Sequence, residues 1–78
     1  MEHYKTKDIG EAAALLTLGI ELLPLEYDSA GFYWFVFENG EYAKTVAHTY
    51  WFGNLMQNVK RYNESLSTLK DRIFANRG

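Results

Sequence analysis

The stretch that most constrains the fold is GFYWFVFE, residues 31–38, which places five aromatic rings in eight positions. Aromatic and β-branched residues of this kind favour a strand. Side chains alternate between the two faces of a strand, which separates Phe32, Trp34 and Val36 from Tyr33, Phe35 and Phe37. Both faces are therefore apolar. One face can pack on helices, and the other needs a cover, which can be another helix of the chain, a second copy or a ligand.

The length of the chain limits how much of this apolar surface it can bury. Its 78 residues predict a single domain over 1–78, and a domain of this size buries only about 60–65% of its unfolded surface. The sequence contains no cysteine, which excludes disulfides and thiolate metal sites. Large rings and oligomerisation are the remaining ways to stabilise such a domain.

A helix is predicted within residues 6–20. Asp8 is a candidate N-cap, and Glu11 follows it at the spacing of a capping box. The apolar residues that we expect to share one face of this helix are Ile9, Ala12, Ala13 and Leu16. Gly19 suits the left-handed position that ends a helix.

A hairpin is predicted next. Residues 20–27 are apolar, and Pro24 among them favours an edge strand or a bulge. The sequence DSAG at 28–31 is typical of a turn, and 32–38 supplies the second strand. Residues 3–6 can add a third short strand.

Two further helices are expected after the hairpin. Asn39 can cap the first, whose broad apolar side comprises Tyr42, Ala43, Val46, Ala47, Tyr50 and Trp51, and Gly53 ends it. Residues 54–57 form a connector with Leu55 and Met56 as apolar anchors. Asn58 can cap the last helix, whose apolar seam is Val59, Tyr62, Leu66, Leu69 and Ile73. The predicted fold class is α+β, in the order helix, two-stranded antiparallel hairpin, helix, helix.

Charge is unevenly distributed along the chain. Residues 1–39 carry two lysines and seven acidic residues, whereas residues 40–78 carry six basic and three acidic residues. The hairpin has only acidic charges, which argues against a base-stacking platform because such platforms need cations for the phosphates. The candidate phosphate contacts lie instead on the last helix, namely Lys60, Arg61, Ser65, Thr68, Lys70 and Arg72. The alternative is an ordinary solvated face of mixed charge, since Glu64 and Asp71 lie beside them.

The sequence gives little support for catalysis. His3 and His48 are the only histidines, and a metal needs three or four convergent ligands. An enzyme would need a cleft joining His48, Glu41 and Thr45. Neither a paired nucleophile and base nor a glycine-rich phosphate loop is evident. We therefore expect no enzymatic activity, no cofactor and no small-molecule substrate.

The chain also lacks a run of the roughly 20 apolar residues that a membrane span requires, and its first residues are too polar for a signal peptide. A cytoplasmic protein without a membrane partner is expected. Its excess of rings predicts an interaction module that self-associates or binds another protein, with Trp34, Trp51, Phe52 and Phe74 as candidate anchors. The alternative hypothesis is a nucleic-acid accessory protein that uses the basic stripe of the last helix.

The sequence also resembles a small bacterial and phage domain family classed as a domain of unknown function. The segments that carry the resemblance are TKDIGEAAALLTLGI at 6–20, FVFE at 35–38, YWFGN at 50–54 and RYNESLSTLKDRIF at 61–74. The chain differs from the family pattern in its denser aromatic strand and in the connector NLMQ. The resemblance implies a domain of helix, hairpin and two helices, and it transfers no activity or functional residue.

Overall fold

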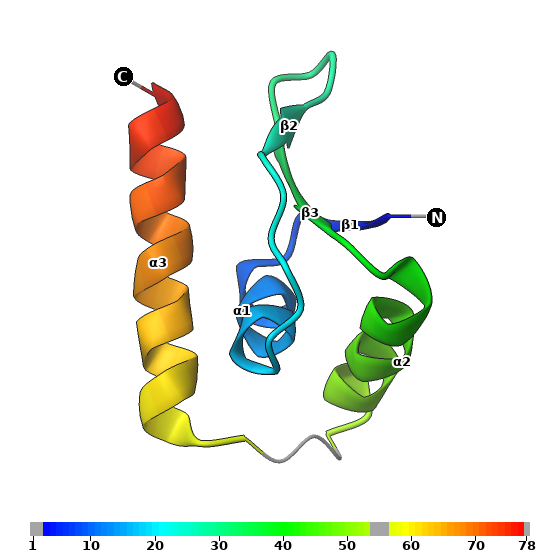
Figure 1. Cartoon of the computed structure of the whole chain (residues 1–78). Helices are drawn as coiled ribbons and strands as arrows, with labels where there is room; N and C mark the ends of the chain where they lie inside the picture. The colour runs from blue at the N-terminus through cyan, green and yellow to red at the C-terminus, as the bar shows by residue number, and fades with distance from the viewer. Residues whose placement is uncertain (1–2, 54–56, 78) are drawn as a thin grey trace.

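The computed structural model describes residues 3–53 and 57–77. Its elements are β1 (Tyr4–Thr6), α1 (Ile9–Thr17), β2 (Glu26–Tyr27), β3 (Tyr33–Phe37), α2 (Gly40–Trp51) and α3 (Val59–Arg77). Figure 1 shows α1 in the middle of the molecule, α2 and α3 on either side of it, and the strands at one end. The predicted α+β class and the order of the elements are confirmed, including the third short strand at the N-terminal end.

The strands form one antiparallel sheet in the order β1-β3-β2. The aromatic strand β3 is central because both other strands pair with it. On the β2 side, Leu22 pairs with Phe37 and Glu26 pairs with Trp34. Three residues, 23–25, therefore lie opposite only two, 35 and 36. This extra residue is a β-bulge, and it contains Pro24, as the sequence predicted for a position that cannot donate to the ladder.

The predicted helix starts are confirmed by their caps. The Asp8 side chain accepts the Glu11 N–H at 2.7 Å, and the Asn58 side chain accepts the Arg61 N–H at 3.0 Å. Asn39 caps α2 in the left-handed region, with φ of 50°. The chain changes direction sharply between β3 and α2, which requires this left-handed conformation. Asparagine tolerates it better than most residues, so Asn39 suits the position.

The burial of α1 differs from the sequence prediction. Four consecutive residues, Ala12 to Leu15, are completely buried, so α1 has no solvent-exposed face over this turn. The predicted apolar residues lie in or against the core, but Ala14 and Leu15 are buried as well, because neighbours surround this helix: α2 on one side, α3 on the other and the sheet at its end. Alanine side chains are small enough to let all three approach closely.

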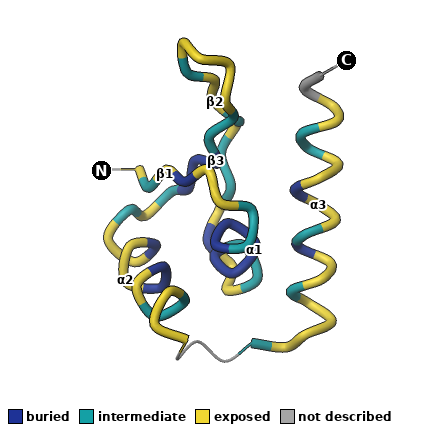
Figure 2. Tube along the Cα trace, turned by 180° about the vertical axis from the view of Figure 1, so that it is seen from behind, coloured by how far each residue is buried: buried dark blue, intermediate teal, exposed yellow. Residues whose placement is uncertain are grey.

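The outer helices bury narrower strips than the sequence predicted. In α2 the buried residues are Ala43, Val46 and Ala47, whereas Tyr42 and Trp51 are about half exposed. In α3 the seam centres on Leu69, which is fully buried. The assignment of Val59 to this seam was wrong, since its side chain is largely exposed. Figure 2 shows that buried and intermediate positions alternate with exposed ones along α3, so only one side of this helix packs on the core.

Leu55 and Met56, the predicted anchors of the connector, lie outside the described residues. Gln57 follows them, and its side-chain amide donates to the Ala14 carbonyl at 2.7 Å, which ties the approach to α3 to the central helix. Within residues 3–53 and 57–77, no helix is both long enough and apolar enough to cross a membrane.

Candidate functional site

The candidate site is a set of exposed apolar side chains where α2 ends and α3 begins, at the end of the molecule away from the sheet in Figure 1. It comprises Trp51, Phe52 and Val59, which are 59%, 68% and 73% exposed, and we call it the end patch. We take them as the candidate contact site, because exposed apolar side chains that adjoin one another usually mark a contact. Two of its three members were predicted as interface anchors from the sequence.

Tyrosine hydroxyls join the two helices beneath the end patch. The Tyr62 hydroxyl of α3 donates to the Gly10 carbonyl of α1 at 3.1 Å, and it also contributes a hydrogen bond to Tyr50 of α2. Burial raises the pKa of Tyr50, and the Tyr62 hydrogen bond and the charges of Asp8 and Glu11 raise this pKa further. The last turn of α2 and the first turns of α3 are therefore fixed to the start of α1.

A buried carboxylate fixes Trp51 itself. Glu11 is only 3% exposed, and its Oε2 accepts the indole N–H of Trp51. Its Oε1 accepts the Tyr4 hydroxyl at 2.7 Å. The carboxylate thus connects β1, α1 and α2, and it holds the indole N–H of a residue that is 59% exposed.

No ion pair involves this carboxylate among the described residues, so other groups must compensate for burial of its charge. Two side-chain donors bind its oxygens, and bonds to a charged acceptor are about twice as strong as neutral ones. Glu11 also lies in the first turn of α1, where the helix dipole favours a negative charge. In the part of the chain that the structure describes, every buried side-chain nitrogen or oxygen has a partner.

The sequence prediction for Glu11 was wrong in one respect. In a capping box its side chain would return to the N–H of the cap residue, but the Asp8 N–H donates instead to Thr6 Oγ1 at 3.1 Å. Sequence reasoning therefore missed the role of Glu11. The only sign of this role in the sequence is that Glu11 begins the segment EAAALL, whose other side chains are all apolar.

Tyr4 gives this network a measurable pH dependence. Burial, the Glu11 hydrogen bond and the Glu11 charge raise the pKa of Tyr4 from 10.0 to about 12. Because the folded pKa lies above the unfolded pKa, this stabilisation is present below pH 10 and is lost as the pH rises toward 12. We expect the denaturation midpoint to fall over this interval, and to fall less in Tyr4→Phe. Equal losses in both proteins would contradict the assignment.

The other two predicted anchors lie elsewhere. Phe74 is 72% exposed on the C-terminal part of α3, far along the helix from Val59. Trp34 is half-buried in β3, and its indole N–H donates to Asp28 Oδ2 at 3.1 Å. The four predicted anchors therefore do not form one surface, and only Trp51 and Phe52 belong to the end patch.

Residues 1–75 match the family model of a domain of unknown function, DUF5659. The chain belongs to the DUF5659 family. This match confirms the predicted resemblance to a domain of unknown function, while the bacterial or phage origin stays a prediction. No curated protein and no solved structure shows a match to the chain.

The candidate phosphate contacts of this DUF5659 member do not form one exposed stripe. Ser65 is buried, and its hydroxyl accepts the Thr17 hydroxyl at 2.8 Å, because this position of α3 faces α1. The Thr68 hydroxyl donates to the Glu64 carbonyl at 3.0 Å, and Arg72 is half-buried. Lys60, Arg61 and Lys70 are exposed. Phosphate binding by these cations stays a prediction.

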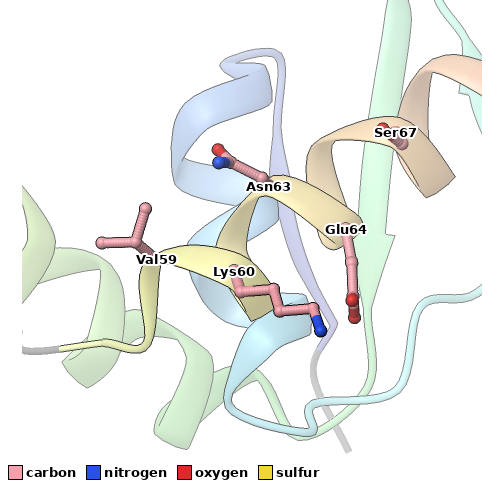
Figure 3. Close-up of a pocket in the computed structure, with 5 residues that line it drawn as sticks. All are labelled: Val59, Lys60, Asn63, Glu64 and Ser67. Atoms are coloured by element: carbon pink, nitrogen blue, oxygen red, sulfur yellow. The ribbon is translucent and has the colours of Figure 1, made fainter.

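A shallow surface region of about 630 Å³, largely open to solvent, lies along the first turns of α3. It is lined by Val59, Lys60, Asn63, Glu64 and Ser67. Figure 3 shows Val59 and Asn63 on one side of the helix and Lys60 and Glu64 on the other. The surface beside the apolar patch therefore carries one positive and one negative side chain.

The exposed side of α2 holds the residues that an enzyme would have needed. The His48 ring lies 4.6 Å from that of Phe52, and the Thr45 hydroxyl donates to the Glu41 carbonyl at 3.1 Å. Hollows of about 320 Å³ flank them. No group of three potential metal ligands occurs among the described residues.

Proposed function

We propose that the chain is a small non-enzymatic interaction module that self-associates through the end patch. The observation that carries this proposal is the position of Trp51, a residue that is more than half exposed while its indole N–H is bound by the buried Glu11 carboxylate. Tryptophan is enriched among residues that dominate interface energies. A ring held in one orientation before binding loses little conformational entropy when a partner covers it.

The charges beside the patch favour a second copy as the partner. Lys60 and Glu64 lie one turn apart on the first turns of α3, on the other side of the helix from Val59. In a twofold symmetric dimer the same surface meets itself, so Lys60 of each copy can face Glu64 of the other. Apolar rings at the centre and opposite charges at the rim are the usual anatomy of such contacts.

Sedimentation of the full chain at micromolar concentration tests this function. We expect a concentration-dependent dimer that Phe52→Ser with Val59→Ser weakens by at least about tenfold, since each truncated anchor costs on the order of 1–2 kcal/mol. Trp51 stays unchanged because its loss would also disturb Glu11. Phe74→Ser is the matched control, since Phe74 is equally exposed but lies away from the patch.

Two results would contradict self-association through the end patch: a wild-type chain that stays monomeric, or a dimer that Phe74→Ser weakens as much as the double variant. Salt-dependent retention on DNA that is lost in Arg61→Glu with Arg72→Glu would favour the nucleic-acid alternative instead.

We also propose that the protein is cytoplasmic. A chain without cysteine forms no disulfides and so does not need an oxidising compartment.

A further inference from the structure

The face of the sheet away from α1 carries a cation held between two aromatic rings. Lys7 Nζ lies 4.6 Å from the ring centroid of Phe32 and 4.7 Å from that of Trp34. The Asp28 Oδ2 atom is 3.6 Å from the same nitrogen. Two rings and a carboxylate around one ammonium group are the arrangement that recognises alkylated ammonium ions.

A hollow next to this cluster is also lined by aromatic and charged side chains. A hollow of about 310 Å³ is bordered by Lys5, Glu26, Tyr27, Asp28 and Trp34. Lys5 and Glu26 form an ion pair of 2.7 Å along one side of it. The sequence prediction of a purely acidic hairpin therefore missed the lysines that β1 and the residues after it bring beside the hairpin.

The rings and the carboxylate are positioned by bonds that do not involve Lys7. Asp28 Oδ1 accepts the backbone N–H groups of Ala30 at 2.9 Å and Phe32 at 3.0 Å, and Oδ2 accepts the Trp34 indole. The Phe32 N–H is the main cause that lowers the pKa of Asp28, so this carboxylate is charged at neutral pH. The site would therefore persist if Lys7 left it.

We propose that this cluster is a binding site for an alkylammonium group, such as a methylated lysine side chain of a partner, and that Lys7 occupies the site when no ligand is bound. A primary ammonium is strongly hydrated, and an exposed cation–π contact is weak. A methylated ammonium is less hydrated and gains more from the rings, so it can displace Lys7. This site is separate from the end patch and does not depend on self-association.

Titration with tetramethylammonium, followed by the indole N–H resonances in ¹H–¹⁵N spectra, tests the proposal. We expect the Trp34 signal to shift and the Trp51 signal to stay in place. Lys7→Gln removes the internal competitor and should tighten binding by about two- to tenfold, in line with the small energy of an exposed cation–π contact. Phe32→Leu should weaken it, and far-UV circular dichroism checks that each variant is folded.

Lys5→Gln is the matched control, because it removes the same charge from the same face without vacating the rings. Equal tightening in Lys5→Gln and Lys7→Gln would overturn the role of Lys7. Equal binding of choline and its uncharged isostere 3,3-dimethylbutan-1-ol, or no Trp34 shift with tetramethylammonium in Lys7→Gln, would overturn the cation site. Tighter binding of acetylated trimethyl-lysine amide than of phosphocholine supports a protein partner as the source of the alkylammonium group. Tighter binding of phosphocholine would contradict a protein partner.

Discussion

Replacement of Glu11 by alanine is expected to destabilise the fold by about 2–6 kcal/mol, because two side-chain donors would each lose their acceptor. The Tyr4 hydroxyl and the Trp51 indole both donate to this carboxylate, and each would lose its buried acceptor at a cost of about 1–3 kcal/mol. The loss is a large part of the roughly 5–15 kcal/mol that stabilises a typical domain. Chemical denaturation of the wild type and the variant measures it.

Glu11→Gln is the control for this experiment, because it keeps the shape of the side chain and one acceptor oxygen. Its amide nitrogen would face a donor, so we expect an intermediate loss of stability. If Glu11→Ala were as stable as the wild type, the carboxylate would not be the junction of β1, α1 and α2. Loss of the distinct Trp51 indole resonance in a folded Glu11→Gln protein would show directly that the carboxylate orients this ring.

Replacement of Gly10 by alanine is expected to destabilise the protein by about 1–3 kcal/mol, as overpacking of a filled site does. Helix propensity alone predicts the opposite sign, a gain of about 1 kcal/mol. A Cβ atom at this position would lie 2.6 Å from the Tyr50 hydroxyl and 3.2 Å from that of Tyr62. Both hydroxyls end rigid rings, so neither moves away easily. Thermal or chemical denaturation gives the sign.

The Tyr50→Phe background separates the steric effect from other effects of the methyl group. It removes the oxygen nearest to the new Cβ atom, so Gly10→Ala should cost less there than in the wild type. A Gly10→Ala protein that is more stable than the wild type would mean that the hydroxyls above Gly10 relax without cost. The same penalty in both backgrounds would assign it to Tyr62 or Asp8, whose Oδ1 would lie 3.2 Å from the added Cβ atom.

Local signals in the sequence predicted most of the fold. Caps at Asp8, Asn39 and Asn58 and the bulge at Pro24 all depend on the chemistry of a few neighbouring residues. The complete burial of α1 and the exposure of Val59 depend on which helix crosses which, and periodicity within one helix does not contain that information. The helical period correctly placed Leu69 in the core but assigned Val59, at the helix start, to the same seam.

The candidate sites were less predictable because their parts come from distant segments. Trp51 and Phe52 were identified by size and type alone. Glu11 joins Trp51 only because α2 returns beside the start of α1, forty residues later in the chain. Lys7 reaches Phe32 and Trp34 because β1 pairs with β3, and a count of charges within the hairpin could not reveal this approach.

The lengths of the strands bear on how copies of this protein can assemble. The aromatic strand β3 pairs with a strand on each side, and these outer strands, β1 and β2, span three and two residues. These outer strands are short, and Pro24 precedes one of them, so they offer little backbone to which a further strand could bind. Association would then proceed through side chains and stop at a small closed complex, so a chain with this many rings can remain protected from fibrillar growth.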